Sequence, residues 1–404
     1  MSPVSPQALD VLRLTLLPNV GPVLIGRLLA TFGSTDAIWH ASRADLERIP
    51  GIGSHKSASI VNGRAAADEL AKKEEELAHK LGVCIAVKGE PRYPKLLAAL
   101  PDAPPLLYIR GTLEPLASDR FTVGIVGSRR CSAYGIEQAA RFAGVLAQAG
   151  LTVVSGGAKG IDTAAHQGAL RASGRTIAVL GCGLAECYPP ENADLFDSIA
   201  QSGALISELP LQTGPMPENF PARNRLISGL SLGVLVVEAS ERSGALITAR
   251  LAAEDHGREV MAVPGRVDSP FSQGCLQLLK GGGAQLVTDP GDVILTLEQA
   301  GFHQHAGTHE SRYPANVPSL FVGGEPKDAE HVQVPEESRG ASTIYASSDF
   351  SKRVLRCLYD SAESITIEEL ASRTGLELAQ TRAVITLLEI QKRVARDGTR
   401  IRKV

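Results

Sequence analysis

The sequence predicts a doubly wound α/β domain, with an extended Rossmann-like parallel sheet, flanked by a small helical domain and a winged helix. Short apolar runs rich in β-branched residues alternate with helical segments between about residues 82 and 300. Such runs are typical of a parallel sheet covered by helices on both faces. Helix-like segments precede this region, and three helices with a two-strand ending follow it. We therefore divide the chain into a helical domain at 1–80, a Rossmann domain at 81–302, a linker at 303–347 and a winged helix at 348–404.

The composition is that of an ordinary globular protein. A chain of 404 residues that is 44% hydrophobic and 21% charged can bury a large core. Its net charge of −3 means that any DNA site must come from locally concentrated basic residues. The six cysteines form no C-x-x-C pair, and no segment resembles a signal peptide or a membrane helix. We expect a cytoplasmic protein with reduced thiols, no metal, no cofactor and no membrane contact.

In the helical N-terminal part, segments 17–22 and 49–54 each end a loop just before an apolar-periodic run. The pair looks like a tandem helix-hairpin-helix (SAM-like) domain, although Asn19 stands where the first hairpin should have a glycine. In the second hairpin Gly51 and Gly53 precede His55 and Lys56, so free N–H groups at a helix N-terminus could meet a DNA phosphate. Simple helix–helix connections would look the same.

The predicted strands of the central domain are short apolar runs. They are 122–126, 151–154, 176–180, 204–206, 234–237, 259–263 and 285–287. A proline-rich lead-in at 82–120 could add one edge strand.

In the last hundred residues the regular spacing of apolar residues is lost and then returns. Residues 303–347 are rich in Pro, Gly, Ser and Glu, as expected of a linker, and nothing near His303, His305 and His309 completes a metal site. Helix-like segments at 352–359, 367–373 and 377–390 precede two strands joined by an Asp397-Gly398 turn. From 352 to 404 there are eleven Lys and Arg against seven Asp and Glu, net +4. This winged helix could bind DNA or only proteins.

Three loops after predicted strands are the places to look for a ligand, because helix N-termini gather at the carboxyl ends of parallel strands. They are 127–135, 155–162 and 238–249. Each combines small residues with hydroxyls, and the first two add a cation, which together make an anion cradle. No G-x-x-x-x-G-K-[ST] occurs, and Gly181-Cys-Gly183 lacks the third glycine of a dinucleotide fingerprint. ATP hydrolysis and NAD binding are therefore unsupported.

A fourth segment, Asn219-Phe-Pro-Ala-Arg-Asn-Arg225, joins an aromatic ring to two arginines. Single-stranded DNA is held by cations along its phosphates and by aromatic or guanidinium planes against its bases. Phe220, Arg223 and Arg225 supply such groups, although a core ring and internal ion pairs would also account for them.

The order of these motifs resembles the DNA-processing protein A (DprA, Smf) family. Motifs that follow one another in the family's order are Gly127-Ser-Arg129, Ser155-Gly-x-Ala-Lys-Gly-Ile-Asp162, Tyr188-Pro189, Phe220-Pro-x-Arg-Asn-Arg225, Ser243-Gly244 and Ala262-Val-Pro-Gly265. The resemblance covers about 80–300. It implies a non-enzymatic protein that binds single-stranded DNA, forms a homodimer through the Rossmann domain and loads RecA recombinase onto DNA in natural transformation. Gly274-Cys-Leu276 departs from the family's Gly-[Ser/Thr]-Asn, which puts that loop in doubt as a contact.

Carried over by position, the resemblance places Arg129 and Lys159 on phosphates, and Phe220 and Arg225 in the pocket. The full predicted set is Gly127, Ser128, Arg129, Ser155, Gly156, Lys159, Gly160, Phe220, Arg223, Asn224, Arg225, Ser243 and Gly244. For the acids Asp162, Glu208 and Glu238 we expect structural roles, as a helix cap and as partners of Arg223 or Arg225.

Two alternatives stay open. Related extended Rossmann enzymes, the nucleoside-monophosphate phosphoribohydrolases, carry a Pro-Gly-Gly-x-Gly-Thr loop followed by a glutamate; here 238–249 and Glu254 stand in that place. An adaptor that touches only proteins would need the basic loops to be buried.

Overall fold

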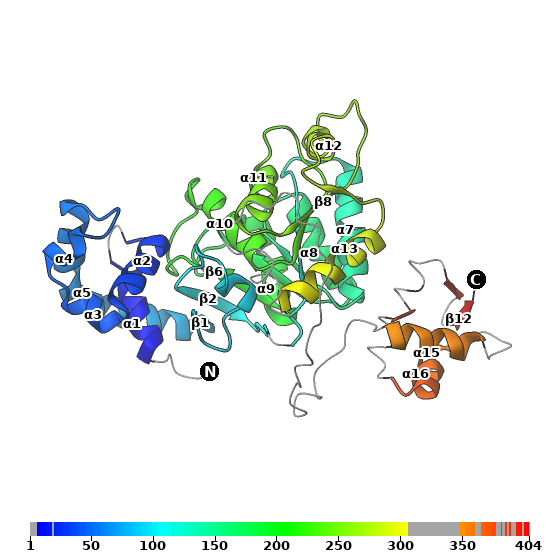
Figure 1. Ribbon diagram of the computed structural model, residues 1–404, viewed down its shortest axis with the longest axis horizontal. Coiled ribbons are helices and arrows are strands. Elements are labelled where there is room, and N and C mark those ends of the chain that lie inside the picture. The colour runs from blue at the N-terminus through cyan, green and yellow to red at the C-terminus, as the bar shows by residue number, and fades with distance from the viewer. Residues whose placement is uncertain are drawn as a thin grey trace, which may run out of the picture. The chain divides into compact units, whose positions relative to one another are not determined.

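The structure is a computed structural model, shown in Figure 1. It describes residues 6–17, 20–115, 117–305, 348–359, 365–376, 381, 384, 385, 388, 393–397 and 400–403. The chain divides into two compact units, 1–294 and 295–404, which we describe separately. Within the described ranges, no helix has the length and apolar character needed to cross a membrane.

The first unit begins with a helical region. Its helices are α1 (Pro6–Thr15), α2 (Pro22–Phe32), α3 (Thr35–His40), α4 (Arg43–Glu47) and α5 (Ser54–Lys80). As predicted, α2 and α5 start directly after the glycine turns, with Gly21 and Gly53 at their N-caps. Gly51 has φ +91°, a left-handed conformation that favours glycine, and its carbonyl accepts a hydrogen bond from Lys56 Nζ at 3.1 Å. This lysine is therefore engaged within the second hairpin.

A nine-stranded sheet forms the rest of the unit. Its strands are β1 (Val83–Val87), β2 (Leu106–Gly111), β3 (Thr122–Val126), β4 (Thr152–Ser155), β5 (Thr176–Val179), β6 (Ala204–Ser207), β7 (Gly233–Val236), β8 (Glu259–Ala262) and β9 (Gln285–Leu286). All seven predicted strands are present, each shifted by no more than one residue at either end. The lead-in contributes two strands, β1 and β2, where one was expected. They pair with each other, and β2 with β6, in antiparallel fashion.

The strand order is β1-β2-β6-β5-β4-β3-β7-β8-β9, and the strands from β6 to β9 run parallel. From β3 the chain first builds outward through β4, β5 and β6, and then returns to the other side of β3 with β7. The order of the strands therefore reverses at β3. Ligands of open α/β sheets bind in the crevice at such a reversal, outside the carboxyl ends of the strands.

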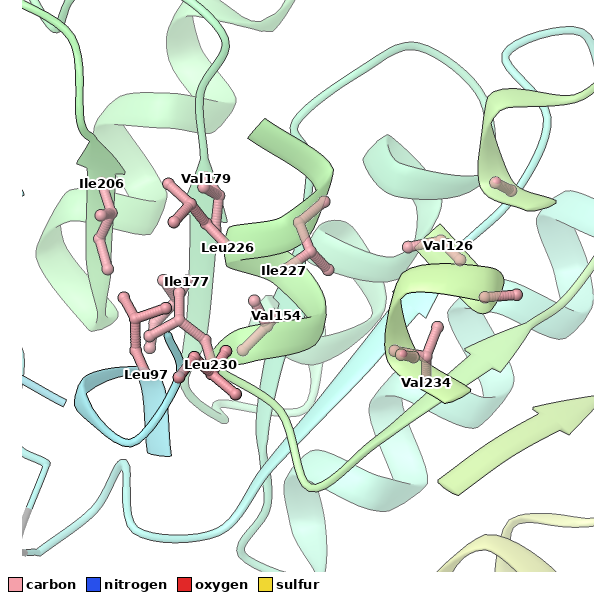
Figure 2. Packing of buried hydrophobic residues seen from close by; sticks show 14 of the residues in the cluster. Leu97, Val126, Val154, Ile177, Val179, Ile206, Leu226, Ile227, Leu230 and Val234 are labelled. Atoms are coloured by element: carbon pink, nitrogen blue, oxygen red, sulfur yellow. The ribbon is translucent and has the colours of Figure 1, made fainter. Parts of the chain in front are cut away.

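Helices cover both faces of this sheet. They are α6 (Lys95–Ala98), α7 (Ala133–Gln148), α8 (Ile161–Arg171), α9 (Ala193–Ser202), α10 (Asn219–Gly229), α11 (Gly244–Arg250) and α12 (Gln273–Lys280), with the turns η1 (Pro190–Asn192) and η2 (Leu251–Asp255, π-helical). Successive residues of β5 face opposite sides, as a strand requires: Ile177 packs with α10, and Ala178 with α9. Figure 2 shows Leu226 and Ile227 of α10, and Leu230 just after it, against the strands.

The second unit contains the end of α13 (Pro290–His305), so the first three residues of the predicted linker are helical. Residues 306–347, including His309, lie outside the described residues. Its remaining elements are α15 (Ser348–Tyr359), β10 (Ile365–Thr366), α16 (Ile367–Thr374), β11 (Val394–Asp397) and β12 (Arg400–Lys403). Asp397 lies opposite Arg400, as a two-residue turn requires, although Gly398 is outside the described residues. Strand β10, which pairs with β12, was not predicted.

Part of the third predicted helix of this unit, 377–390, is described. Thr381, Val384, Ile385 and Leu388 are helical and buried, and the other residues of that segment lie outside the described residues.

Candidate nucleic-acid interface

A pocket of about 530 Å³ opens where the strand order reverses. It lies at the carboxyl ends of β3 and β7 and is bordered by α10 and α11. The residues that line it are Val126, Gly127, Ser128, Arg129, Arg130, Ala158, Asp162, Tyr188, Pro215, Pro217, Phe220, Pro221, Arg223, Asn224, Ile227, Ser240, Ser243, Gly244, Ala245, Ile247 and Thr248. The fold therefore brings the three predicted loops and the Phe220 segment to one place.

The loop after β3 supplies a close backbone approach and an exposed cation. A Cβ at Gly127 would lie 2.5 Å from Ile161 Cγ1, so only glycine fits there. Ser128 is buried, and its N–H donates to the Glu238 carbonyl at 2.8 Å, which ties this loop to the one after β7. Arg129 is exposed, and its guanidinium carbon lies 5.1 Å from the centre of the Phe220 ring. This is a cation–π arrangement.

Glu238 holds the first loop in place. Its buried carboxylate accepts hydrogen bonds from the Ser132 N–H at 2.8 Å and from Ser132 Oγ at 2.7 Å. Ser132 in turn caps α7 by accepting from the Gly135 N–H at 3.1 Å. Glu238 is therefore structural, as expected, but its partner is Ser132 and not an arginine.

The loop after β4 offers one exposed cation. Lys159 Nζ lies 2.5 Å from Glu191 Oε1, and both side chains are more than half exposed. Gly160 has φ +83°, and a Cβ there would lie 2.5 Å from the Ser128 carbonyl oxygen. Ser155 was predicted to offer a backbone or hydroxyl donor to DNA; it is fully buried, and Oγ donates to the Ile125 carbonyl at 2.7 Å. Its hydroxyl is therefore already used by the neighbouring strand β3.

Asp162 and Arg223 form the floor of the pocket. Both are buried, and Arg223 donates to the carbonyls of Gly156, at 2.5 Å, and Val179. Burial raises the pKa of Asp162, and the charge of Arg223 only partly offsets this. Burial likewise lowers the pKa of Arg223 to about 10, with the charge of Asp162 acting in the opposite direction. Arg223 thus supports the pocket from below and is not the free cation that we predicted.

The carboxylate of Asp162 fixes the loop in which Lys159 lies. Its Oδ2 accepts a hydrogen bond from the Ala158 N–H at 3.3 Å. Asp162 was expected to cap α8. Its carboxylate instead accepts this hydrogen bond from Ala158, which precedes the helix.

Two aromatic rings line the pocket, one of them under Arg129. The rings of Tyr188 and Phe220 lie 5.4 Å apart between centres at an angle of 50°, and Tyr188 is 39% exposed. Tyr188, Arg130 and Ile247 line the pocket but were not among the predicted contacts. The available signals were an aromatic side chain in a loop that follows a strand, and a second arginine beside Arg129.

The loop after β7 completes the rim. Ser243 caps α11 by accepting from the Ala245 N–H at 3.3 Å. A Cβ at Gly244 would meet nothing within 4 Å, so this position is open to a ligand. Asn224 Nδ2 donates to the Gly244 carbonyl at 3.4 Å, which joins α10 to α11.

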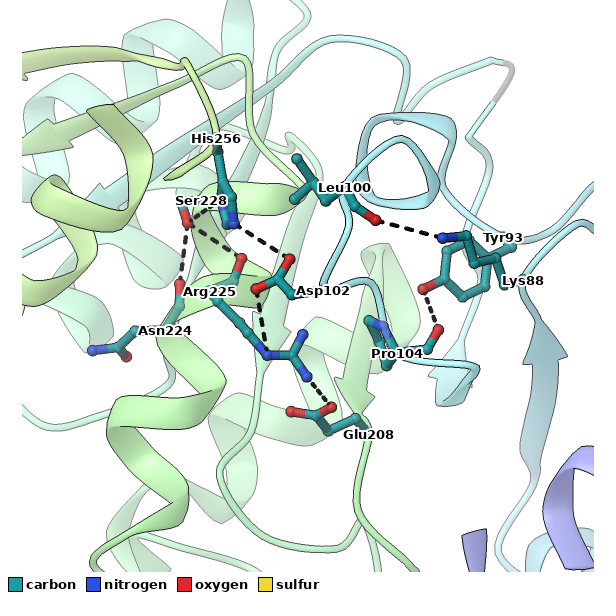
Figure 3. Close-up of polar contacts among 10 residues, drawn as sticks. All are labelled: Lys88, Tyr93, Leu100, Asp102, Pro104, Glu208, Asn224, Arg225, Ser228 and His256. Carbon is teal, nitrogen blue, oxygen red and sulfur yellow. Dashed lines mark hydrogen bonds and ion pairs between the residues drawn. The ribbon is translucent and has the colours of Figure 1, made fainter. Parts of the chain in front are cut away.

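Arg225 lies outside the pocket, which corrects its prediction as a lining residue. Its guanidinium donates to the buried carboxylate of Glu208, and Nε lies 3.8 Å from Asp102 Oδ2 (Figure 3). The reason is helical geometry: residues two apart on a helix point in nearly opposite directions, so Arg223 and Arg225 cannot share a face. The expected pairing of Glu208 with an arginine is confirmed.

The segment that departs from the family pattern belongs to the core. The Gly274 N–H donates to the Ala239 carbonyl at 2.8 Å, and the Cys275 thiol is buried against β7. Burial raises the pKa of Cys275 to about 12, so the thiol stays protonated. All six cysteines are free thiols.

Comparisons with known proteins cover each part of the chain. The family model described as DNA recombination-mediator protein A matches residues 84–298, that of the SAM-like helix-hairpin-helix tandem matches 11–64, and that of the DprA winged helix domain matches 341–398. Protein Smf of Synechocystis sp. is 34% identical over 383 residues, 92% of either chain. Protein Smf of Escherichia coli is 49% identical over 212 residues, 52% of this chain and 55% of that one. The X-ray structure of DNA processing protein A from Streptococcus pneumoniae superimposes with a TM-score of 0.61 at 35% identity, over 73% of this chain and 98% of that one.

Proposed function

The chain belongs to the DNA recombination-mediator protein A family, and from this membership and the pocket we propose that it binds single-stranded DNA. One observation carries the proposal: an exposed arginine, Arg129, lies over an aromatic ring, Phe220, inside a recess at the reversal of the strand order. Proteins that bind single strands combine these two groups, a cation for the phosphates and a ring on which a base stacks.

The rest of the pocket fits a nucleic-acid strand. Arg130 is a second exposed cation of the lining, and Lys159 follows the lining residue Ala158 without lining the pocket itself. Gly127 and Gly244 allow a backbone or a base to come close. Bases inside a duplex cannot reach a recessed ring, whereas unpaired bases can turn toward it. Recognition would therefore be tolerant of sequence and selective for single strands.

The same family membership supports wider proposals. A recombination mediator delivers a recombinase, so we place RecA recombinase as the partner and natural transformation as the setting. We propose a homodimer through the Rossmann domain and a cytoplasmic location, in keeping with the six free thiols. Co-sedimentation with RecA on single-stranded DNA and the mass of the protein in solution test these two associations.

The alternative as a phosphoribohydrolase finds little support in the pocket. Among its described lining residues the carboxylate is Asp162, which is buried and hydrogen bonded to the loop that precedes its helix. Glu254, the other acid considered for this role, is exposed on η2 and does not line the pocket. Release of adenine from AMP by the purified protein would reverse this judgement.

The decisive experiment reverses the charge of two exposed cations from two predicted loops. We expect the double variant Arg129→Glu/Lys159→Glu to lose most of its affinity for a labelled oligodeoxythymidine in an anisotropy titration. The dependence of log affinity on log salt should become shallower by about 1.4, because each phosphate contact on a single strand contributes about 0.7. A matched control, Arg141→Glu/Arg171→Glu, makes the same charge change at exposed positions of α7 and α8. If the first double variant binds as the wild type does, the pocket is not the DNA site.

A further inference from the structure

Helix α10 (Asn219–Gly229) presents two different faces. Phe220, Arg223, Asn224 and Ile227 line the pocket, at the spacing of three and four that defines one side of a helix. Arg225 and Gly229 lie on the other side and face the lead-in segment between β1 and β2, and Ser228 bonds to His256. The contacts on the rear face of α10 therefore determine the position of the residues on its pocket face.

Three separate segments meet at Arg225. Its side chain is 13% exposed and donates to Glu208, which follows β6 and is 7% exposed. Its Nε lies 3.8 Å from Asp102 Oδ2, in the lead-in segment after α6. The guanidinium thus joins α10 to the end of β6 and to the lead-in.

His256 extends this cluster to the end of η2. Its Nε2 lies 3.5 Å from Asp102 Oδ1, and its Nδ1 lies 2.9 Å from Ser228 Oγ (Figure 3). Serine, histidine and aspartate in this order resemble a catalytic triad. However, Ser228 Oγ is fully buried, so no substrate can reach it, and the arrangement is a structural connection.

Apolar contacts press the same face against the lead-in. A Cβ at Gly229 would lie 2.7 Å from Leu97 Cδ1 on α6. Tyr93 is buried beside this contact, and its hydroxyl donates to the Pro104 carbonyl at 2.6 Å. The lead-in therefore packs closely against α10, and its Asp102 forms the ion pair with Arg225 of that helix.

Removing these charged groups from water costs free energy. Burial raises the pKa of Glu208 despite the nearby charge of Arg225. For Asp102 burial acts in the same direction, but His256 and Arg225 outweigh it and lower the pKa. Buried ion pairs often add no more stability than apolar residues of the same size would, whereas their geometry can specify how segments pack.

We propose that Arg225 is a positioning residue for single-stranded DNA, which with Asp102 and Glu208 fixes the rotation of α10 and so holds Phe220 and Asn224 in the pocket. The inference rests on the proposed function. It differs from a direct DNA contact because the guanidinium is turned away from the pocket and is already paired.

For two substitutions, the positioning role and long-range electrostatics predict changes in DNA affinity of opposite sign. Asp102→Asn and Glu208→Gln each remove one negative charge, which by long-range attraction alone would tighten DNA binding. Positioning predicts a loss of roughly tenfold in affinity for oligodeoxythymidine, as when one base no longer stacks. The salt dependence should stay that of the wild type, because no phosphate contact is removed.

Arg225→Gln provides the third measurement, made with an oligonucleotide that carries 2-aminopurine. We expect weaker affinity, an unchanged salt dependence and less quenching of the 2-aminopurine fluorescence, which reports base stacking. A salt dependence shallower by about 0.7 would instead identify Arg225 as a phosphate contact and overturn the proposal.

A matched control separates positioning from loss of stability. Arg175 pairs with buried Asp119 at 2.8 Å, near the amino end of β5 and away from the pocket. Arg175→Gln should lower the melting temperature while leaving DNA affinity unchanged. If the wild type binds no single-stranded DNA, the proposed function fails. If the wild type binds and Asp102→Asn and Glu208→Gln bind as well or better, the positioning role alone fails.

Discussion

The contact between Arg129 and Phe220 leads to a prediction that separates two kinds of DNA contact in one experiment. The guanidinium carbon lies 5.1 Å from the ring centre, and in the described part of the chain no carboxylate forms a salt bridge with Arg129. The arginine is therefore free to turn toward a phosphate when a base takes its place on the ring. Arg129→Gln removes the phosphate contact, and Phe220→Leu removes the stacking surface while keeping an apolar side chain.

The two substitutions should differ in their dependence on salt. Loss of one phosphate contact makes the slope of log affinity against log salt shallower by about 0.7, so a fourfold rise in salt shrinks the defect of Arg129→Gln by about 2.6-fold. Loss of one stacked base costs about 1–3 kcal/mol at every salt concentration, or roughly 5- to 150-fold in Kd. Phe220→Leu should therefore run parallel to the wild type, and Arg129→Gln should converge with it as salt increases.

Anisotropy titrations with a labelled oligodeoxythymidine at several KCl concentrations measure both effects. The chain offers a matched control, because Arg120 lies 5.2 Å over the ring of Phe121 at the amino end of β3, away from the pocket. Arg120→Gln and Phe121→Leu should leave the Kd and the slope unchanged. A wild-type slope for Arg129→Gln, or a wild-type Kd for Phe220→Leu, would refute the role given to that side chain.

Two further predictions follow from single contacts. Glu191 Oε1 lies 2.5 Å from Lys159 Nζ, so Glu191→Gln should free this cation and tighten DNA binding by roughly two- to fivefold. Glu259→Gln, at the start of β8, removes the same charge and should leave DNA binding unchanged. Equal effects of the two substitutions would show that only the net charge matters. Burial, with a smaller effect from the charge of Arg223, lowers the pKa of His166 to about 3. The unfolded chain takes up this proton near the ordinary value of 6.5, so stability present above that pH is lost as the pH falls toward 3, by up to about 1.4 kcal/mol per pH unit. Urea unfolding of wild type and His166→Gln between about pH 7 and about pH 5 should show a shallower loss in the variant, and parallel curves would contradict the assignment.

The sheet could be predicted from the sequence because buried parallel strands leave a strong local signal. Apolar β-branched runs such as 122–126 and 234–237 are bounded by turns, and the structure places them within one residue. The second lead-in strand, 106–111, was missed because it follows a proline-rich stretch and pairs with β1 and β6, contacts that no local pattern encodes. The bounds of helix α10 were not predicted, since Pro221 and mixed polar residues conceal its period.

The position of the pocket was predictable, but the state of each side chain in it was not. Loops after β3, β4 and β7 must meet at the reversal of a doubly wound sheet, whatever their residues are. Whether a hydroxyl or a guanidinium remains free depends on neighbours that are distant in sequence. Ser155 is taken by Ile125, and Arg223 by Gly156 and Val179.

The motif that contains Arg223 and Arg225 predicts the residue types near the pocket but not the direction in which each side chain points. In the sequence they are two cations beside an aromatic residue, and both were assigned to DNA. Once the segment is known to be a helix, their spacing of two directs them to opposite faces, and the pocket can take only the face that carries Phe220. The exposed cations are then Arg129 and Arg130 in the pocket lining, and Lys159, paired with Glu191, in the loop after β4. On the proposed function, a chain of net charge −3 binds DNA through these exposed cations and a ring, while the paired side chains of Arg223 and Arg225 hold the surrounding segments in place.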